Sequence, residues 1–243
     1  GSTSVVHINY KSAQVDQVYF PQTEVIGDIA LSMDALADCF GLDSSFVLKE
    51  FYQVRDFVRH MTTASLEEIS FPPKPQHLVA QIRQSMGYYD IITLDNGVYK
   101  IWFARNYPAF QPNTILLDNA LATMGAGLPS AMTAAMLYPN RKVMAICGDG
   151  GFMMNSQELE TAVRLKLNLV VLILNDSSYG MIRWKQAGMG FNDWGLEYSN
   201  PDFSLYAQSY GVTPHEIQEH NNLSMVIDEA FDSGGVHLID LPV

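Results

Sequence analysis

From residue 76 to the end of the chain, apolar runs of strand length alternate with helical patterns. Lys142–Cys147 and Leu169–Leu174 are continuous apolar runs after at most one polar residue, as is typical of strands buried on both faces. The alternation predicts an α/β fold, a doubly wound, mostly parallel sheet with helices on both faces. The predicted strands are 90–94, 142–147, 169–174 and 235–240, and the predicted helices are 76–86, 127–137, 156–165, 203–210 and 225–231.

Residues 1–70 follow a different pattern. Val5–Asn9 reads as a short strand, and helical patterns cover Ile29–Cys39 and Ser44–Met61. Phe71–Pro75 contains three prolines, so it fits neither a helix interior nor a central strand. We therefore expect a boundary there, with residues 1–70 as the tail of a preceding domain and its connecting helices, and residues 71–243 as the α/β domain.

Composition excludes several classes of protein. Of the 243 residues, 48% are apolar and 16% are charged, which provides for a core and argues against disorder. The net charge of -12 argues against nucleic-acid and anionic-membrane partners, and the chain has no apolar run long enough to span a membrane. The start at Gly1 lacks Met and the features of a signal peptide, so we expect a piece cut from a longer protein.

The cysteines and histidines point away from disulfide and zinc chemistry. Cys39 and Cys147 lie far apart in the chain, and we expect two buried free thiols in a reducing, cytoplasmic compartment. The six histidines show no clustering, and the spacing of His215 and His220 fits no HExxH zinc site.

Acidic residues follow two of the predicted strands. Gly148-Asp149-Gly150-Gly151 follows the strand at 142–147, and Asn175-Asp176 follows the strand at 169–174. Because parallel strands end at the same edge of a sheet, Asp149 and Asp176 should meet there. Two carboxylates beside glycines suit Mg²⁺ with a phosphate ligand, since the metal supplies the positive charge that this acidic chain lacks.

We further expect Asn155 or Ser156 to cap the following helix, whose positive end would add to the anion site. The alternative interpretation of the whole segment is a tight glycine turn and an unrelated loop aspartate.

These residues also carry a family resemblance. Gly148-Asp149-Gly150, followed after 24 residues by Asn175-Asp176, resembles the thiamin-diphosphate motif, which is GDG, a spacer of similar length and usually Asn-Asn. Ala122–Pro129 is similar to the TMGxGLP segment of that family. From about residue 5 onward the chain most resembles the acetolactate synthase group, and Val6–Asn9 and Ile26–Ile29 look like the tail of its central domain.

The resemblance implies thiamin diphosphate and Mg²⁺ as cofactors. The side chains of Asp149 and Asp176 and the carbonyl of Ser178 would ligate the metal. Met124 would take the catalytic role of an apolar wedge that bends the cofactor, and the Ala122 carbonyl would accept from the pyrimidine 4′-amino group. The residues implied to surround the diphosphate are Gly97, Val98, Tyr99, Gly148, Gly150, Gly151, Tyr179, Gly180 and Met181.

The sequence departs from the family pattern at three positions, Asp176, Ala122 and Tyr99, and Trp184 matches the flavin-independent synthases. Asp176 replaces the commoner Asn, as in the catabolic synthases, and still offers a ligand for a hard cation. Ala122 stands where Gly is common, and Tyr99 stands where these synthases often carry His. Trp184, three residues after Met181, would line the substrate pocket or serve in packing.

The implied reaction of the parent enzyme joins two pyruvate molecules into 2-acetolactate with loss of CO₂, a transferase or lyase step of branched-chain amino acid biosynthesis. In this family an activating Glu comes from the pyrimidine-binding domain of a neighbouring subunit in a homo-oligomer, a dimer or tetramer. No match to that domain exists here, so we expect this chain to be inactive alone.

Two alternatives stay open. One is another thiamin-diphosphate enzyme, of the benzoylformate decarboxylase, benzaldehyde lyase or oxalyl-CoA decarboxylase type. The other is a non-catalytic module that binds a phosphate ligand or supports oligomerisation.

Overall fold

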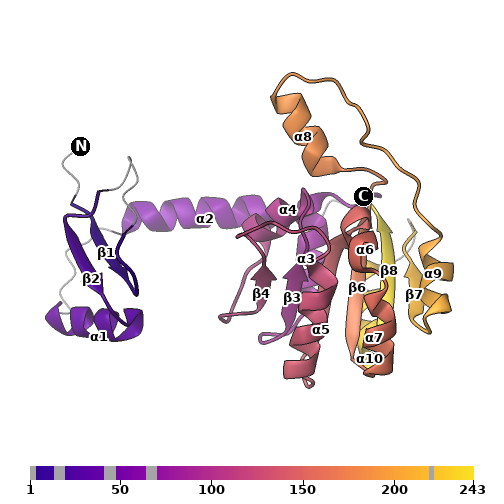
Figure 1. Ribbon diagram of the computed structural model, residues 1–243, viewed down its shortest axis with the longest axis horizontal. Helices are drawn as coiled ribbons and strands as arrows, with labels where there is room; N and C mark the ends of the chain where they lie inside the picture. The colour runs from indigo at the N-terminus through magenta and orange to yellow at the C-terminus, as the bar shows by residue number, and fades with distance from the viewer. Residues whose placement is uncertain (1–3, 14–19, 41–47, 64–69, 219–221) are drawn as a thin grey trace. The chain divides into compact units, whose positions relative to one another are not determined.

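The computed structural model describes residues 4–13, 20–40, 48–63, 70–218 and 222–243. The chain divides into two compact units, Gly1–Arg55 and Asp56–Val243, and the division falls within helix α2, Lys49–Thr63 (Figure 1). The part of the predicted helix at residues 44–47 lies outside the described residues. The predicted domain boundary between residues 70 and 71 stays a prediction.

The described residues of the first unit form little core of their own. Strands β1 (Val6–Asn9) and β2 (Thr23–Ile26) pair in parallel, and helix α1 (Ile29–Cys39) follows. The carboxylate of Asp28 caps α1 by accepting from the backbone N–H of Leu31 at 2.9 Å. No residue of α1 is buried although the helix is largely apolar. Cys39 is exposed, so the prediction that both thiols are buried is wrong for this one, because α1 presents no face to a core.

The second unit is built on a six-stranded sheet in the order β4-β3-β5-β6-β8-β7, and every neighbouring pair is parallel. This confirms the predicted α/β fold class. The two edge strands were not predicted. Strand β4 (Ile115–Leu117) is only three residues long and shows no periodicity, and strand β7 (Thr213–Glu216) is polar and contains Pro214. The strands are β3 Ile91–Leu94, β4 Ile115–Leu117, β5 Val143–Gly148, β6 Leu169–Asn175, β7 Thr213–Glu216 and β8 Val236–Pro242.

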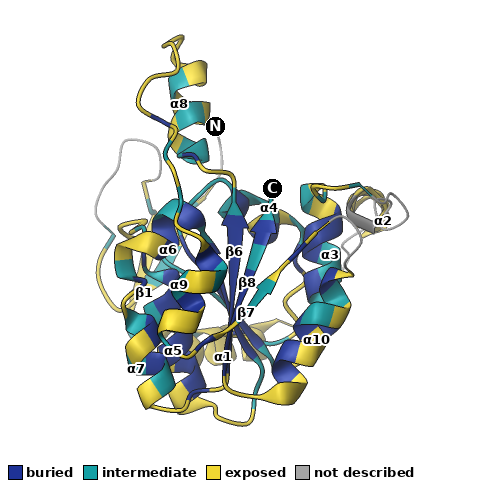
Figure 2. Cartoon of the chain, turned by 90° about the vertical axis from the view of Figure 1, so that its right-hand side faces the viewer, coloured by how far each residue is buried: buried dark blue, intermediate teal, exposed yellow. Residues whose placement is uncertain are grey.

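Helices cover both faces of this sheet (Figure 2). Alternate residues of β5 enter different cores: Met144 and Ile146 join one, while Val143, Ala145 and Cys147 join the other. This double burial explains why the strand reads as a continuous apolar run. One face is covered by α3 (Pro75–Ser85), α4 (Tyr99–Asn106) and α10 (Leu223–Ser233), and the other by α5 (Gly127–Leu137), α6 (Asp149–Asn155), α7 (Glu158–Arg164) and α9 (Phe203–Ser209).

Helix α8 (Gly180–Gly188) has no buried residue and lies beyond the carboxyl ends of the strands (Figure 1). It escaped prediction, as did α4 and α6, because glycines and loop-like residues obscure the start of each helix. In the described part of the chain, no helix has the length and apolar character needed to cross a membrane.

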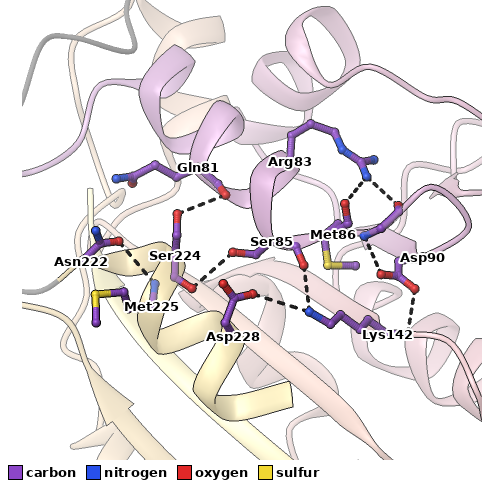
Figure 3. Close-up of polar contacts among 11 residues, drawn as sticks. Gln81, Arg83, Ser85, Met86, Asp90, Lys142, Asn222, Ser224, Met225 and Asp228 are labelled. Carbon is purple, nitrogen blue, oxygen red and sulfur yellow. Dashed lines mark hydrogen bonds and ion pairs between the residues drawn. The ribbon is translucent and has the colours of Figure 1, made fainter. Parts of the chain in front are cut away.

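A polar seam fastens α3 and α10 to the amino edge of the sheet (Figure 3). The Ser224 hydroxyl donates to the carbonyl of Gln81 at 3.4 Å, and the Ser85 hydroxyl donates to the carbonyl of Ser224 at 3.3 Å. Lys142, just before β5, donates to the Ser85 carbonyl at 3.1 Å and pairs with Asp228 at 3.5 Å. These contacts anchor the layer at the edge opposite to the strands' carboxyl ends.

Two histidines meet where β7 and β8 pair, although the sequence showed no cluster of histidines. His215 Nε2 and His237 Nδ1 lie 3.0 Å apart, and His237 is buried. One of these nitrogens must donate and the other must accept, so the contact disfavours two charged rings. Burial, followed by the proximity of His237, lowers the pKa of His215, while Glu229 acts in the opposite direction.

We expect this pair to make folding sensitive to mild acid. Because the His215 pKa is lowered, the unfolded chain takes up more protons as the pH falls through the ordinary histidine range near about 6.5. The contribution of this pair to the free energy of unfolding is therefore fully present above that range and is lost below it. Urea unfolding at about pH 7.5 and about pH 5.5 should show a smaller difference for His215→Gln than for the wild type. His7→Gln in the first unit serves as the control, and an unchanged difference in His215→Gln would contradict the expectation.

Candidate functional site

A glycine-rich cavity lies at the carboxyl ends of β3, β5 and β6. It receives residues from the loops after these strands, from the turn before α5 and from the start of α8. Ala122 is the one predicted site residue that does not line it; together with Met124 it lines an adjoining cavity. The predicted residues that line the first cavity are Gly97, Val98, Tyr99, Met124, Gly148, Asp149, Gly150, Gly151, Asp176, Ser178, Tyr179, Gly180 and Met181. Their contacts with a cofactor stay predictions.

Asp149 is held by donors on both carboxylate oxygens. It is the first residue of α6, directly after β5, and it is only 2% exposed. Its Oδ1 accepts from the N–H of Gly150 and the hydroxyl of Tyr198, both at 2.9 Å. Its Oδ2 accepts from the N–H of Ser177 at 2.8 Å and the amide of Asn200 at 2.6 Å. The carboxylate is therefore fixed in orientation by residues from two other loops.

Asp176 supplies the second carboxylate from the loop after β6. It accepts from the Ser178 N–H at 3.1 Å and from the Ser178 hydroxyl at 3.4 Å. Ser177 between them has a φ of 51°, which turns the chain sharply. Burial raises the pKa of Asp176. The negative charge of Asp149 acts in the same direction because the two carboxyl groups are close.

A cation between these carboxylates would relieve their repulsion. Among the described residues, no cluster of three or more His, Cys, Asp or Glu side chains could hold a metal ion. A hard cation here would accordingly complete its coordination with a backbone carbonyl, water or the oxygens of a phosphate ligand.

At several glycines of the cavity, neighbouring atoms leave little room for a Cβ. A Cβ at Gly150 would lie 2.6 Å from the Tyr198 hydroxyl, and one at Gly180 would lie 3.1 Å from Asp176 Oδ2. The backbone can therefore approach a ligand closely, and α8 begins at Gly180. The residues present fit a phosphate group bound together with a cation.

Tyr99 adds an unpaired donor to the cavity. Tyr99 is 6% exposed, and its hydroxyl has no hydrogen-bond acceptor among the described residues, although the backbone N–H of Gly148 lies close to the hydroxyl oxygen. Burial, followed by the charge of Asp95, raises the pKa of Tyr99 well above its ordinary value, so the hydroxyl keeps its proton. A buried donor without a partner is uncommon, and an anionic ligand in the cavity would satisfy it.

The turn that carries Met124 is fixed by a buried carboxylate. Asp95, at the end of β3, is fully buried and accepts from the Gly125 N–H at 2.9 and 3.0 Å. The carbonyl of Gly125 accepts from the Asn155 amide at 2.8 Å, and Gly125 has a φ of 86°. Met124 is thereby placed where the two cavities adjoin.

The predicted capping role of Asn155 and Ser156 is wrong. The residue before α7 is Gln157, which makes no side-chain cap, while Asn155 bonds the Met124 turn and the Ser156 hydroxyl contacts the Tyr206 hydroxyl. The helix that begins at the site is α6, because β5 passes into it without a loop. Trp184 is 56% exposed on α8 and lines neither cavity.

Three residues that hold Asp149 or the Met124 turn in place were missed from the sequence: Asp95, Tyr198 and Asn200. Asp95 follows a predicted strand, so the rule that selected Asp149 would also have selected it. Tyr198 and Asn200 lie about fifty residues after Asp149 in a loop without a motif. Nothing in their spacing indicated the contact.

Comparison with known proteins bears on this geometry. Residues 95–241 match the family model of the thiamine pyrophosphate enzyme C-terminal TPP binding domain. The whole chain is 29% identical to the acetolactate synthase of Bacillus subtilis (strain 168), covering 43% of it, and 29% identical to the catabolic acetolactate synthase of Raoultella terrigena, covering 44%. Over 63% of its length it is 33% identical to the acetolactate synthase isozyme 2 large subunit of Escherichia coli (strain K12), covering 28% of that protein.

The chain thus spans less than half the length of these curated relatives. The family match runs through the loops after β3, β5 and β6 that form the cavity. The chain belongs to the thiamine pyrophosphate enzymes, whose C-terminal TPP-binding domain it contains, and it resembles the acetolactate synthases.

Proposed function

We propose that this chain is the Mg²⁺- and diphosphate-binding part of a 2-oxo-acid decarboxylating carboligase of the acetolactate synthase type. The observation that supports this proposal is the meeting of Asp149, Asp176 and Ser178 at one glycine-lined cavity. The two side chains and the Ser178 carbonyl would ligate Mg²⁺, and the glycine backbones would face the diphosphate.

The other residues would position the cofactor. Thiamin diphosphate, when bound, supplies the electron sink for decarboxylation of a 2-oxo acid. Met124 would support the bend of the cofactor between the two cavities, and the Ala122 carbonyl, from the adjoining cavity, would accept from its amino group. Tyr99 would donate to a diphosphate oxygen from the buried side.

The cation dependence of binding tests this function. In a calorimetric titration of the chain with thiamin diphosphate, we expect heat of binding with Mg²⁺ and none after chelation, since two carboxylates alone repel a diphosphate. Binding that ignores Mg²⁺, or no binding, would favour the alternative of a non-catalytic module that takes another ligand.

Activity requires more than this chain in the proposal. The activating Glu and the pyrimidine-binding domain would come from a neighbouring subunit of a homo-oligomeric, cytoplasmic parent enzyme. In an assay of this chain with pyruvate, Mg²⁺ and thiamin diphosphate, we expect no 2-acetolactate. Substantial product would contradict the proposal that a neighbouring subunit must complete the site. The 29% identity to acetolactate synthases favours pyruvate as substrate over the substrates of other lyases of the family. A substrate profile of the parent enzyme would distinguish these alternatives.

Residues 1–70 would be the tail of the parent's central domain in this proposal. The support is the exposed apolar surface of α1, where Leu31 is 70% exposed and Met33 is 49% exposed. Apolar surface of this kind requires a covering layer, which the rest of a central domain would provide.

Removal of the Tyr99 hydroxyl provides a further test. Tyr99→Phe should leave the free energy of unfolding unchanged or slightly higher, because the hydroxyl is buried without an acceptor among the described residues. The same change should weaken binding of Mg²⁺–thiamin diphosphate by about tenfold, because a donor to an anionic oxygen is lost. Urea unfolding and calorimetry separate the two effects. Tyr138→Phe on the exposed surface is the control, and equal cofactor affinity in Tyr99→Phe would rule out the diphosphate contact.

A further inference from the structure

A short segment, Leu196–Asn200, lies against the loop that carries Asp176 and Ser178, two of the three proposed cation ligands. Ser178 and Glu197 form an antiparallel bridge. The Tyr179 N–H donates to the Leu196 carbonyl at 3.0 Å, and Leu196 is buried. The segment is therefore held to the site by backbone contacts with Ser178 and Tyr179, just before α8 begins at Gly180.

Tyr198 from this segment touches two of the three proposed cation ligands. Its hydroxyl lies 2.9 Å from Asp149 Oδ1 and 3.3 Å from the Ser178 carbonyl oxygen. Its ring packs against the ring of Tyr179 with 4.8 Å between centroids. One hydroxyl thus lies close to oxygens of two residues that follow different strands, Asp149 after β5 and Ser178 after β6.

The carboxylate of Asp149 has no acceptor position left for a cation. A carboxylate offers about four lone-pair positions, and the four donors described above take them. The donors from Gly150 and Ser177 are backbone groups, and the Asn200 amide also donates to Asn175 Oδ1 at 2.9 Å. Tyr198 is the donor that also covers the Ser178 carbonyl.

We propose that the Tyr198 hydroxyl competes with the divalent cation for Asp149 and Ser178, and so lowers the affinity of the site for the cation and its diphosphate ligand. This inference rests on the proposed function of the cavity. Asn200 holds Asp149 from the other oxygen and keeps the carboxylate oriented while the Tyr198 side chain swings away. Tyr198 is a positioning residue in this scheme, since it acts through the cation ligands.

Titration with Mn²⁺ as the probe tests the inference directly. With thiamin diphosphate at a fixed concentration, the electron paramagnetic resonance signal of free Mn²⁺, compared with that of the same mixture without protein, reports how much metal the full chain binds. Tyr198→Phe, which keeps the ring and loses the hydroxyl, should bind Mn²⁺ about tenfold more tightly than the wild type. Tyr198→Leu also lacks the hydroxyl and should change in the same direction. Tyr88→Phe, at an exposed ring outside the cavity, should match the wild type.

The outcomes separate this inference from the proposed function. Unchanged or weaker Mn²⁺ binding in Tyr198→Phe and Tyr198→Leu, with clear binding by the wild type, would overturn the inference and leave the proposed function standing. Binding by the variants without measurable binding by the wild type would support both. No binding by any of these proteins, each shown by circular dichroism to be folded, would contradict the proposed function and the inference together.

Discussion

Asp149→Asn is expected to abolish cation-dependent binding of thiamin diphosphate. The change removes the negative charge at the centre of the proposed site and turns one acceptor oxygen into a donor that faces other donors. We expect the affinity for Mg²⁺–thiamin diphosphate to fall by at least about a hundredfold, more than the loss of a supporting contact causes. Calorimetry with and without Mg²⁺ measures the effect.

Two variants sharpen this test. Asp232→Asn makes the same change of charge at an exposed position of α10 and should bind like the wild type. Asp176→Asn makes it at the second carboxylate, where an amide oxygen still ligates a hard cation, and should retain binding within about tenfold. If Asp149→Asn stays folded and binds within that same range, the negative charge of Asp149 is not required for cation-dependent binding.

Gly151→Ala is expected to destabilise the fold by about 2 kcal/mol. A Cβ at this position would lie 2.6 Å from Oδ2 of the buried Asp95, whose carboxylate holds the N–H of Gly125. The gain in helix propensity inside α6, about 1 kcal/mol, offsets only part of this cost. Because the Met124 turn depends on Asp95, cofactor affinity should fall as well. Urea unfolding and calorimetry measure the two effects.

Gly188→Ala is the matched control for this change. Gly188 ends α8, and a Cβ there would meet nothing within 4 Å. Its free energy of unfolding should stay within about 0.5 kcal/mol of the wild type. If Gly151→Ala proves equally neutral, Asp95 moves freely and does not fix the Met124 turn.

The central sheet could be predicted from the sequence because its strands are buried on both faces. The runs at β5 and β6 leave no other reading once glycines and polar loops bound them. The edge strands β4 and β7 depend on pairing with a neighbour rather than on their own pattern, so local periodicity does not reveal them. Helix α6 was missed because it begins inside the motif at Asp149.

The candidate site divides in the same way. Asp149 and Asp176 could be placed together because adjacent parallel strands deliver their ends to one edge. The contacts of Tyr198 and Asn200 with Asp149 span 49 and 51 positions of the chain and depend on the path of an irregular loop. Hydrophobic spacing carries no information about such a path.

The double burial of β5 and β6 also has a consequence for the tolerance of the site to change. Gly148 pairs with Leu174, so the two loops leave the sheet at fixed relative heights. A slip of β6 by one residue would displace Asp176 by about 3.3 Å along the strand. It would also exchange Leu172 and Ile173 between the two cores, which hold them now on opposite faces. The heights at which the segments carrying the two carboxylates leave the sheet are therefore set by the core.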